Sequence, residues 1–293
     1  MFALYQTDLS RFADAIQHFP LLFQPRKADS HKGSYGTLGI IGGAAGMSGA
    51  LVLAATAAIY NGCGKVWAGF NQPNLPLPLI PERPEIMLAT ANVLQQRSDI
   101  SAWVLGCGMG TDNTAAELLH RQLNQPADKP LLLDADALNL VARDQTLADA
   151  CRRHGRLVLT PHPAEAARLL HTDTASVQAD RRSAAQSLSE NFNAIVVLKG
   201  HRSLIAQPGA PLHTNTSGNA GLATAGSGDV LSGIIGSLLA QGIPPYQAVC
   251  GGVWLHGAAA DVLRNSQIGE SGMLAGEIAP AARWLRNRLT AAR

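Results

Sequence analysis

The sequence is poor in aromatic residues, in charge of either sign and in long apolar runs. Phe, Trp and Tyr make up 5% of the 293 residues, and Asp, Glu, Lys and Arg make up 15%, with a formal net charge of +2. No cluster of Lys and Arg marks a nucleic-acid or membrane surface, and no run reaches the roughly 18 apolar residues of a membrane-spanning helix. We therefore expect an aliphatic core and no nucleic-acid or membrane partner.

Cysteine is also scarce, and its positions argue against two kinds of framework. Cys63, Cys107, Cys151 and Cys250 form no CxxC pair, and none has a histidine at metal-ligand spacing. Four ordinary buried thiols are therefore the simpler interpretation than disulfides or a zinc site. The N-terminal stretch has an Asp at position 8 and no apolar run of signal-peptide length, so we expect a cytoplasmic protein.

Short apolar runs alternate with helical patterns along the chain. Strands are predicted over residues 38–41, 65–70, 102–105, 131–133, 157–159 and 195–198, and helices over 50–60 and 230–240. Fully apolar short strands indicate a parallel sheet covered by helices on both faces. We expect one α/β domain over residues 1–293, in which residues 1–30 form a lead-in helix and loop and the Pro-rich residues 72–84 form an ordered connection.

Polar turns follow four of the predicted strands. They contain Gly108, Asp134, His162 and Lys199, each shortly after its strand. The carboxyl ends of parallel strands meet at one edge of the sheet, and ligands of open α/β sheets bind there. We therefore expect these four residues to share one edge.

The strongest functional signal is Gly226-Ser227-Gly228-Asp229, which ends a stretch rich in small residues and precedes an apolar helix. Glycine lets the backbone approach a ligand, and the first N–H groups of a helix are unpaired, so an anion is favoured there. A carboxylate beside that anion suits a base that takes a proton from a hydroxyl. The alternative is that Asp229 only caps the helix. The small-residue approach and Gly233 and Gly236 favour the functional interpretation.

Two weaker signals lie after later strands. Lys199 begins the segment Lys199-Gly200-His201-Arg202-Ser203 and is suited to neutralise a phosphate, although a solvated strand-end lysine is the commoner outcome. Two prolines fix the backbone around His162. Glu165 begins the next helix, where it either orients a magnesium-bound water or complements the helix dipole.

Two further motifs allow more than one interpretation. The glycine-rich residues 42–50 lie between a strand and a helix but contain neither GxGxxG nor a P-loop lysine, so we interpret them as a tight glycine wall against a ligand. Asp134 and Asp136 have the chemistry of metal ligands, but their spacing aims them at different sides of a turn. A cap for the helix at Leu138, made by one of the two, is the favoured structural role.

Six motifs in order give the chain a family resemblance. They are HKGSYG, the glycine wall, LLLDADALNL, LTPHPAEAARLL, VVLKG and NTSGNAGLATAGSGDVLSGIIGSLLAQG. The chain resembles the ADP- or ATP-dependent NAD(P)H-hydrate dehydratases from about residue 31 to residue 274. The resemblance implies a ribokinase-like three-layer α/β sandwich with a central, mostly parallel sheet. It also implies metabolite repair: hydrated NAD(P)H, or NAD(P)HX, returns to NAD(P)H while ADP, with Mg²⁺, yields AMP and phosphate.

The resemblance also implies roles for individual residues. Asp229 would be the catalytic base, with Gly226, Ser227 and Gly228 as the anion hole. The nucleotide-binding residues would be Lys199, Gly200, His201, Arg202, Ser203 and Gly228. Those that line NADHX or NADPHX would be Ala50, Gly108, His162 and Asp229. Ala164 and Ala225 stand where the family often has glycine; these one-methyl changes narrow the site without removing a charge.

The resemblance extends to partners and assembly. It implies a homotetramer and an NAD(P)HX epimerase acting in the same pathway. Only about 30 residues precede the first motif, so the sequence predicts that the fused N-terminal epimerase domain of many family members is absent and that any epimerase is a separate chain.

Two other functions compete with this prediction. A small-molecule hydroxymethyl kinase of the same superfamily would use the same Gly-Ser-Gly-Asp turn; His162 and the HKGSYG segment speak against it. A nucleotide-sensing module without turnover would lack Asp229, which is present. The sequence leaves open whether ADP or ATP is used and whether NADHX or NADPHX is preferred.

Overall fold

The computed structural model describes residues 5–266 and 268–292, and their main feature is a nine-stranded sheet. The strand order is β3-β2-β1-β4-β5-β6-β7-β8-β9; pairs from β3 to β7 are parallel, and β8 and β9 add antiparallel pairs at one edge. The strands are β1 Thr37–Gly42, β2 Lys65–Phe70, β3 Met87–Thr90, β4 Ala102–Leu105, β5 Leu131–Leu133, β6 Leu157–Leu159, β7 Ile195–Leu198, β8 Leu204–Ala206 and β9 His213–Thr214. The six strands expected from the sequence are all confirmed.

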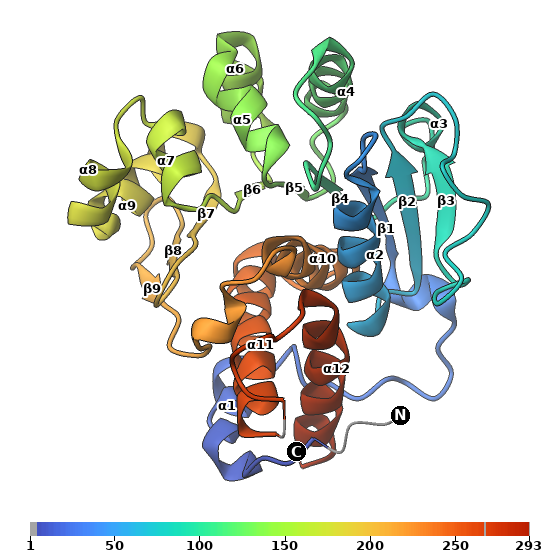
Figure 1. Cartoon of the computed structure of the whole chain (residues 1–293), viewed down its shortest axis with the longest axis vertical. Helices are drawn as coiled ribbons and strands as arrows, with labels where there is room; N and C mark the ends of the chain where they lie inside the picture. Colours follow the sequence, from blue (N-terminus) through green and yellow to red (C-terminus); the bar gives the residue numbers. More distant parts are fainter. Residues whose placement is uncertain (1–4, 267, 293) are drawn as a thin grey trace.

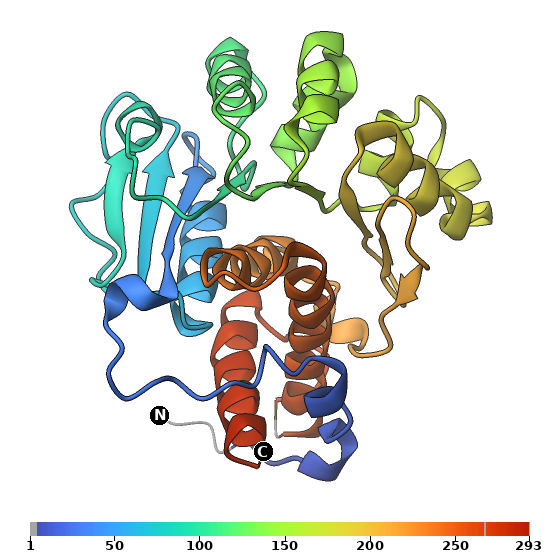
Figure 2. The ribbon, with the colours of Figure 1, turned by 180° about the vertical axis from the view of Figure 1, so that it is seen from behind.

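Helices cover both faces of this sheet. Helices α2, α10, α11 and α12 lie on one face and α3 to α9 on the other (Figures 1 and 2). The helices are α1 Ala15–His18, α2 Ser48–Tyr60, α3 Ala91–Leu94, α4 Asn113–Leu123, α5 Asp136–Arg143, α6 Gln145–His154, α7 Pro163–Leu169, α8 Thr174–Ala179, α9 Arg181–Phe192, α10 Ser227–Ala240, α11 Pro245–Asn265 and α12 Ala275–Ala291, with single 3₁₀ turns at Leu9–Phe12, Lys32–Tyr35 and Ala220–Leu222. The three-layer arrangement is the expected one.

The layers follow from the apolar strands. Successive side chains of a strand point to opposite faces. Ile40 of β1 and Leu132 of β5 therefore pack into the core under α2, α10, α11 and α12, whereas Ile41 and Leu133 pack into the core on the other face. Both cores are aliphatic and fully buried, which explains why these strands read as continuous apolar runs.

The strand order reverses between β1 and β4. From β1 the chain runs outward through β2 to β3 and then returns to pair β4 with the other side of β1. The loops that leave the carboxyl ends of β1 and β4 lie side by side, joined by hydrogen bonds from N of Gly43 to O of Cys107 at 3.0 Å and from N of Ala44 to O of Gly108 at 2.7 Å. Helix α10 contacts β1 and β4, so its N-terminal end belongs to the same region.

Helix α10 lies unusually close to its neighbours because of two glycines. A Cβ on Gly233 would lie 2.1 Å from the backbone oxygen of Ala54 in α2, and one on Gly236 would lie 2.5 Å from Cγ2 of Val104 in β4. Ala, the smallest alternative, does not fit at either position without movement of the backbone or core. These glycines therefore seat α10 directly on α2 and on the sheet.

The N-terminal segment is less helical than its sequence suggests. Residues 9–12 form one 3₁₀ turn and α1 has four residues; Phe19 and Phe23 pack against Trp254 of α11. Residues 1–4 of the expected lead-in lie outside the described residues. The Pro-rich residues 72–84 form an ordered connection without helix or strand, as expected.

Within residues 5–266 and 268–292, no helix combines the length and the apolar character that crossing a bilayer requires.

Candidate active site

The N-terminus of α10 presents free backbone donors near the loop that follows β4. Gly226 takes a left-handed conformation, with φ +86°, and a Cβ there would lie 2.4 Å from Leu53, so glycine is required. Among the described residues, no acceptor is found for the N–H groups of Gly228 and Asp229. Unpaired first-turn N–H groups and the positive end of the helix dipole make this turn suited to an anion.

Asp229 does not cap α10. Gly226 occupies the N-cap position, no side chain caps the helix, and Asp229 lies in the first turn with its carboxyl facing the thiol of Cys107. Burial, and after it the nearby Asp134 carboxylate, raise the pKa of Asp229 to about 6, against a lowering by Cys107 and Lys199. The carboxyl is thus tuned toward the neutral range expected of a general base.

Lys199 is not a solvated lysine. Its Nζ lies 2.7 Å from Oδ1 of Asp134 and 3.8 Å from Oε2 of Glu165, and its side chain is 18% exposed. Burial acts against its charge, but the two carboxylates outweigh burial and raise the pKa of the ammonium. A Cβ on Gly228 would lie 3.5 Å from this Nζ. The ammonium therefore sits beside the anion-binding turn.

The aspartate pair corrects one expectation from the sequence. Asp134 and Asp136 do point to different sides of the turn, but no side chain caps α5. Asp134 is buried and accepts from Lys199 Nζ and from Oγ of Ser232, both at 2.7 Å, whereas Oδ2 of Asp136 accepts from N of Gly110 at 2.9 Å. Ala135, with φ +47°, takes the N-cap position instead. The two carboxylates on either side of it thus bond to residues far away in the sequence and do not cap the helix.

His162 and Glu165 form a capping box at the start of α7. Nδ1 of His162 accepts from N of Ala164 at 3.1 Å, and Oε2 of Glu165 accepts from N of His162 at 2.7 Å. Burial and then Lys199 lower the pKa of His162, and burial raises the pKa of Glu165. Because Nδ1 accepts, the neutral ring carries its proton on Nε2. About half of the His162 side chain is exposed to solvent.

The described residues do not form a metal cage of their own. No group of three or more His, Cys, Asp or Glu side chains within them is arranged to hold a metal ion. The carboxylate of Glu165 is already engaged by His162 and Lys199. Mg²⁺ prefers near-octahedral oxygen ligands and often takes most of them from phosphate and water.

The glycine wall, residues 42–50, packs against the loop that follows β4. Gly108, with φ +58°, follows β4, and a Cβ there would lie 2.8 Å from the backbone oxygen of Met47 and 3.1 Å from Cβ of Ala50. The N–H of Ala44 donates to the carbonyl of Gly108 at 2.7 Å. The expected substrate residues Ala50 and Gly108 therefore do lie side by side.

The segment Lys199–Ser203 forms the turn between β7 and β8. Arg181, at the start of α9, donates to the carbonyls of Leu198, Lys199 and His201 at 2.6–3.3 Å, which holds the turn in place. The sequence analysis missed Arg181, because 17 to 20 residues separate it from its acceptors. It also missed Ser232, although Ser232 stands one helical turn after Asp229 and so shares its face of α10.

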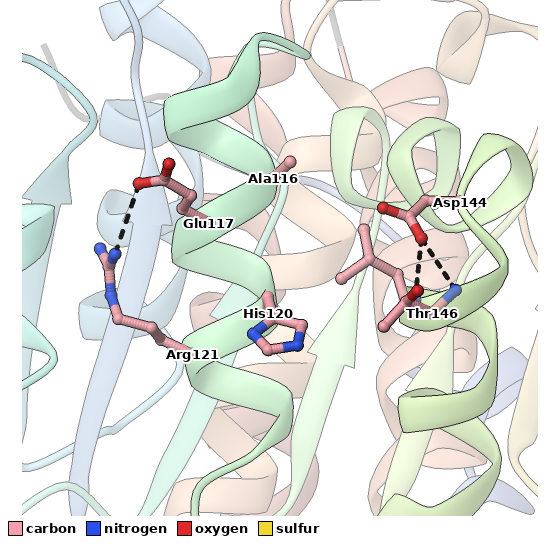
Figure 3. Close-up of a pocket in the computed structure, with 7 residues that line it drawn as sticks. Ala116, Glu117, His120, Arg121, Asp144 and Thr146 are labelled. Carbon is pink, nitrogen blue, oxygen red and sulfur yellow. Dashed lines mark hydrogen bonds and ion pairs between the residues drawn. The ribbon is translucent and has the colours of Figure 1, made fainter.

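Two features lie away from this site. The HKGSYG segment precedes β1, at the amino ends of the strands. A Cβ on Gly36 would lie there 1.8 Å from the carbonyl oxygen of Ala240 at the end of α10. A hollow of about 350 Å³ opens between α4 and α6, on the face opposite α10 (Figure 3). Its charged groups are already paired: Glu117 with Arg121, and Asp144 with the first N–H groups of α6.

Comparison with known proteins gives a consistent result. Residues 38–282 match the family model described as NAD(P)H-hydrate dehydratase. The chain is 60% identical to the ADP-dependent (S)-NAD(P)H-hydrate dehydratase of Neisseria meningitidis, over 93% of this chain and 92% of that protein. It is 40% identical to the bifunctional NAD(P)H-hydrate repair enzyme of Escherichia coli, over 93% of this chain but only 51% of the relative.

Solved structures agree with these relatives. The ADP/ATP-dependent NAD(P)H-hydrate dehydratase of Bacillus subtilis, co-crystallised with ATP and Mg²⁺, superposes with a TM-score of 0.82 at 30% identity, over 93% of this chain and 96% of that chain. A ribokinase-like superfamily protein of Enterococcus faecalis matches with a TM-score of 0.80 at 28% identity, over 92% and 94% of the two chains. The expected ribokinase-like fold is confirmed.

Proposed function

Because the chain belongs to the NAD(P)H-hydrate dehydratase family, we propose that it returns hydrated NADH and NADPH to NADH and NADPH at the expense of ADP, with release of AMP and phosphate. The activity in the name of the Neisseria relative supports this assignment. The observation that carries it is the turn at residues 226–229, where unpaired N–H groups, the Lys199 ammonium and a carboxyl with pKa about 6 converge. The enzyme is then a carbon–oxygen lyase of metabolite repair.

In the first step the ring hydroxyl of the hydrated dinucleotide is phosphorylated. Asp229, as carboxylate, accepts the hydroxyl proton while the oxygen attacks the terminal phosphorus of ADP. The new O–P bond forms as the bond to AMP breaks, and AMP leaves with that electron pair. Gly226, Ser227 and Gly228 supply the anion hole, in which Gly228 N–H and the positive end of α10 offset the charge on the transferred phosphoryl group.

In the second step the phosphate ester is eliminated. The bond between ring carbon and oxygen breaks and inorganic phosphate takes the electron pair. The neighbouring ring carbon gives up a proton to the departing phosphate, and its C–H electron pair restores the double bond of the reduced nicotinamide. Phosphate is a far better leaving group than hydroxide, which is why a nucleotide is consumed to expel one water.

We propose binding roles for the residues around the turn. The nucleotide would lie over the β7–β8 turn and contact Lys199, Gly200, His201, Arg202, Ser203 and Gly228. The hydrated dinucleotide would lie against the glycine wall and contact Ala50, Gly108, His162 and Asp229. The proximity of Ala50 to Gly108 and of Gly228 to Lys199 supports both halves of this arrangement.

Magnesium is proposed as the cofactor that accompanies the nucleotide. The ATP and Mg²⁺ in the crystals of the Bacillus relative support this proposal. Bound to the phosphate oxygens, the ion would offset their charge. Glu165 is proposed to contact the ion through water. The Lys199 ammonium lies 3.8 Å from the Glu165 carboxylate and is itself held by Asp134 at 2.7 Å.

The proposal extends to the setting of the enzyme. We propose a cytoplasmic homotetramer that shares its pathway with an epimerase of hydrated dinucleotides. The bifunctional repair enzyme of Escherichia coli, half of whose length this chain matches, supports the pairing of two activities on these dinucleotides.

A direct assay tests the proposed function. Purified protein is incubated with hydrated NADH, Mg²⁺ and either ADP or ATP, and recovery of the reduced-nicotinamide absorbance is followed together with AMP and phosphate. We expect recovery only when nucleotide is present, and faster with ADP. Phosphorylation of a hydroxymethylpyrimidine or hydroxyethylthiazole at a matching rate, without recovery of NADH, would favour the small-molecule kinase instead.

A further inference from the structure

Beneath the anion-binding turn lies a histidine that the proposed chemistry does not use. His256 is a buried residue of α11, and its Nε2 lies 3.0 Å from the carbonyl oxygen of Ser227 and 3.3 Å from Oγ of the same residue. We propose that His256 is a positioning residue of the reaction, which fixes the Ser227–Gly228 peptide so that Gly228 N–H points at the transferred phosphoryl group. This inference rests on the proposed function.

The contacts of His256 determine its tautomer. A carbonyl oxygen only accepts hydrogen bonds, so the Nε2 that contacts the Ser227 carbonyl carries the proton and donates it. Burial lowers the pKa of His256 to about 4, so the ring is neutral throughout the range in which the enzyme would work. His256 is therefore a fixed hydrogen-bond donor and neither a general acid nor a cation for the phosphate.

Peptide geometry carries the effect of this bond to the site. The carbonyl of Ser227 and the N–H of Gly228 belong to one planar trans peptide unit, in which they point in opposite directions. A bond that pulls the carbonyl toward α11 therefore turns Gly228 N–H away from α11. Gly228 itself lies beside the Lys199 ammonium, since a Cβ there would be 3.5 Å from Nζ.

Helix α11 also holds the loop that leads into the turn. Oγ of Ser217 donates to the carbonyl of Trp254 at 2.8 Å, and N of Gly218 donates to Oδ2 of Asp261 at 2.8 Å. Nδ2 of Asn219 donates to Oδ1 of Asp261 at 3.0 Å. The approach at residues 217–219 and the turn at Ser227 are thus attached to the same rigid helix. His256 makes the attachment at the turn itself, through Ser227.

Two substitutions distinguish orientation from simple packing. His256→Leu keeps the bulk of the side chain but removes the hydrogen-bond donor. We expect kcat to fall about tenfold or more, a smaller loss than the one caused by deleting an anion-hole donor itself. KM for ADP should change by less than about threefold. His256→Gln keeps an N–H donor near the position of Nε2 and should recover most of the lost kcat. Equal loss in both variants, or a loss confined to KM, would overturn the proposal.

His154 of α6 provides a matched control. It is also a buried histidine, but it lies in the helix layer on the face of the sheet opposite α10. His154→Gln should leave kcat and KM within about twofold of the parent enzyme. Thermal unfolding of all three variants reports whether each is folded. If His256→Leu does not fold, the comparison of His256→Gln with the parent enzyme decides the question. We expect the kcat of His256→Gln to lie within about threefold of the parent value. A loss of kcat as large as that for a deleted donor would contradict the proposal.

Nitrogen NMR of the unsubstituted protein tests the same idea without turnover. We expect the His256 ring to be neutral and protonated on Nε2 between about pH 5 and 8. A ring protonated on Nδ1, or one that titrates near pH 6.5, would overturn the proposal even in a fully active enzyme. Absence of dehydratase activity in a protein that shows the expected tautomer would instead refute the proposed function.

Discussion

At the scale of single residues, the site depends on an unequal pair of carboxyl groups. Asp134 is fully engaged by Lys199 and Ser232, both at 2.7 Å, and serves as a fixed negative charge. Asp229 has no comparable cation at hydrogen-bonding distance among the described residues, and its pKa is raised to about 6 by burial and by Asp134. Two neighbouring acids with different environments can thus take different roles, one structural and one chemical.

This difference predicts the pH dependence of the enzyme. Only the carboxylate form of Asp229 accepts a proton, so kcat/KM should fall about tenfold per pH unit below about pH 6. Asp134→Asn removes a negative neighbour and frees the charge of Lys199. Both effects lower the pKa of Asp229 and should move the acidic limb down by roughly one unit. Initial rates measured with hydrated NADH at low concentration check the shift; an unmoved or raised limb would show that Asp134 does not act on Asp229.

The raised pKa of Asp229 also makes the free energy of unfolding depend on pH. Because the folded-state pKa of Asp229 lies above its ordinary value, the folded protein binds more protons than the unfolded chain between about pH 4 and 6. The free energy of unfolding therefore decreases as pH rises through that window. The Asp229 carboxyl, the proposed base, thus destabilises the fold at neutral pH, as expected where function and stability compete.

At the scale of elements, helix α10 connects the site to the core. Its first turn is the proposed phosphate site, and its middle is seated on α2 and β4 through Gly233 and Gly236. The carbonyl oxygen of Ala54 would lie 2.1 Å from a Cβ on Gly233, so α10 can lie this close to α2 only with glycine at that position. The position of the proposed anion hole therefore depends on packing that lies about one and a half to three helical turns away from it.

Gly233→Ala tests this link. The added methyl group must displace backbone, so we expect the free energy of unfolding to fall by about 1–3 kcal/mol and kcat to fall with it. Gly251→Ala in α11 is the matched control, because its nearest neighbours are side-chain atoms of Leu22 and Phe19 at 3.5 Å or more. That variant should be neutral or slightly stabilised by the better helix propensity of Ala. Chemical denaturation and steady-state rates measure both; equal stability of the two variants would contradict the argument.

At the scale of the whole molecule, the six strands β1, β2, β4, β5, β6 and β7 were predicted, whereas β3, β8 and β9 and the contacts across the sheet were not. Buried parallel strands are short apolar runs, so their bounds could be read directly from the sequence. Asp134 bonds to Lys199 and Ser232, which are 65 and 98 residues away, and no local pattern encodes such pairing. The expected cap by Asp134 or Asp136 was wrong for this reason: a local role was assigned to side chains that serve distant partners.

The HKGSYG segment shows the limit of motif-based inference in another way. The motif contributed to the family resemblance, yet it lies at the amino edge of the sheet. There Gly36 packs against the end of α10, and the guanidinium of Arg26 lies 4.0 Å from the centre of the Tyr35 ring. Motif order identified the family without telling which motifs contact substrate. The topology separates the HKGSYG segment, which precedes β1 and packs against the end of α10, from the turn at residues 226–229 at the start of that helix.

The most direct test of the account is the behaviour of Asp229→Asn. The amide keeps the size of the side chain but cannot accept the hydroxyl proton. We expect calorimetric affinities for ADP and hydrated NADH within about threefold of the parent, and turnover at least about a hundredfold slower at every pH, with Asp14→Asn at the surface as an active control. Turnover in Asp229→Asn close to that of the parent enzyme would contradict the central claim that this carboxylate is the base.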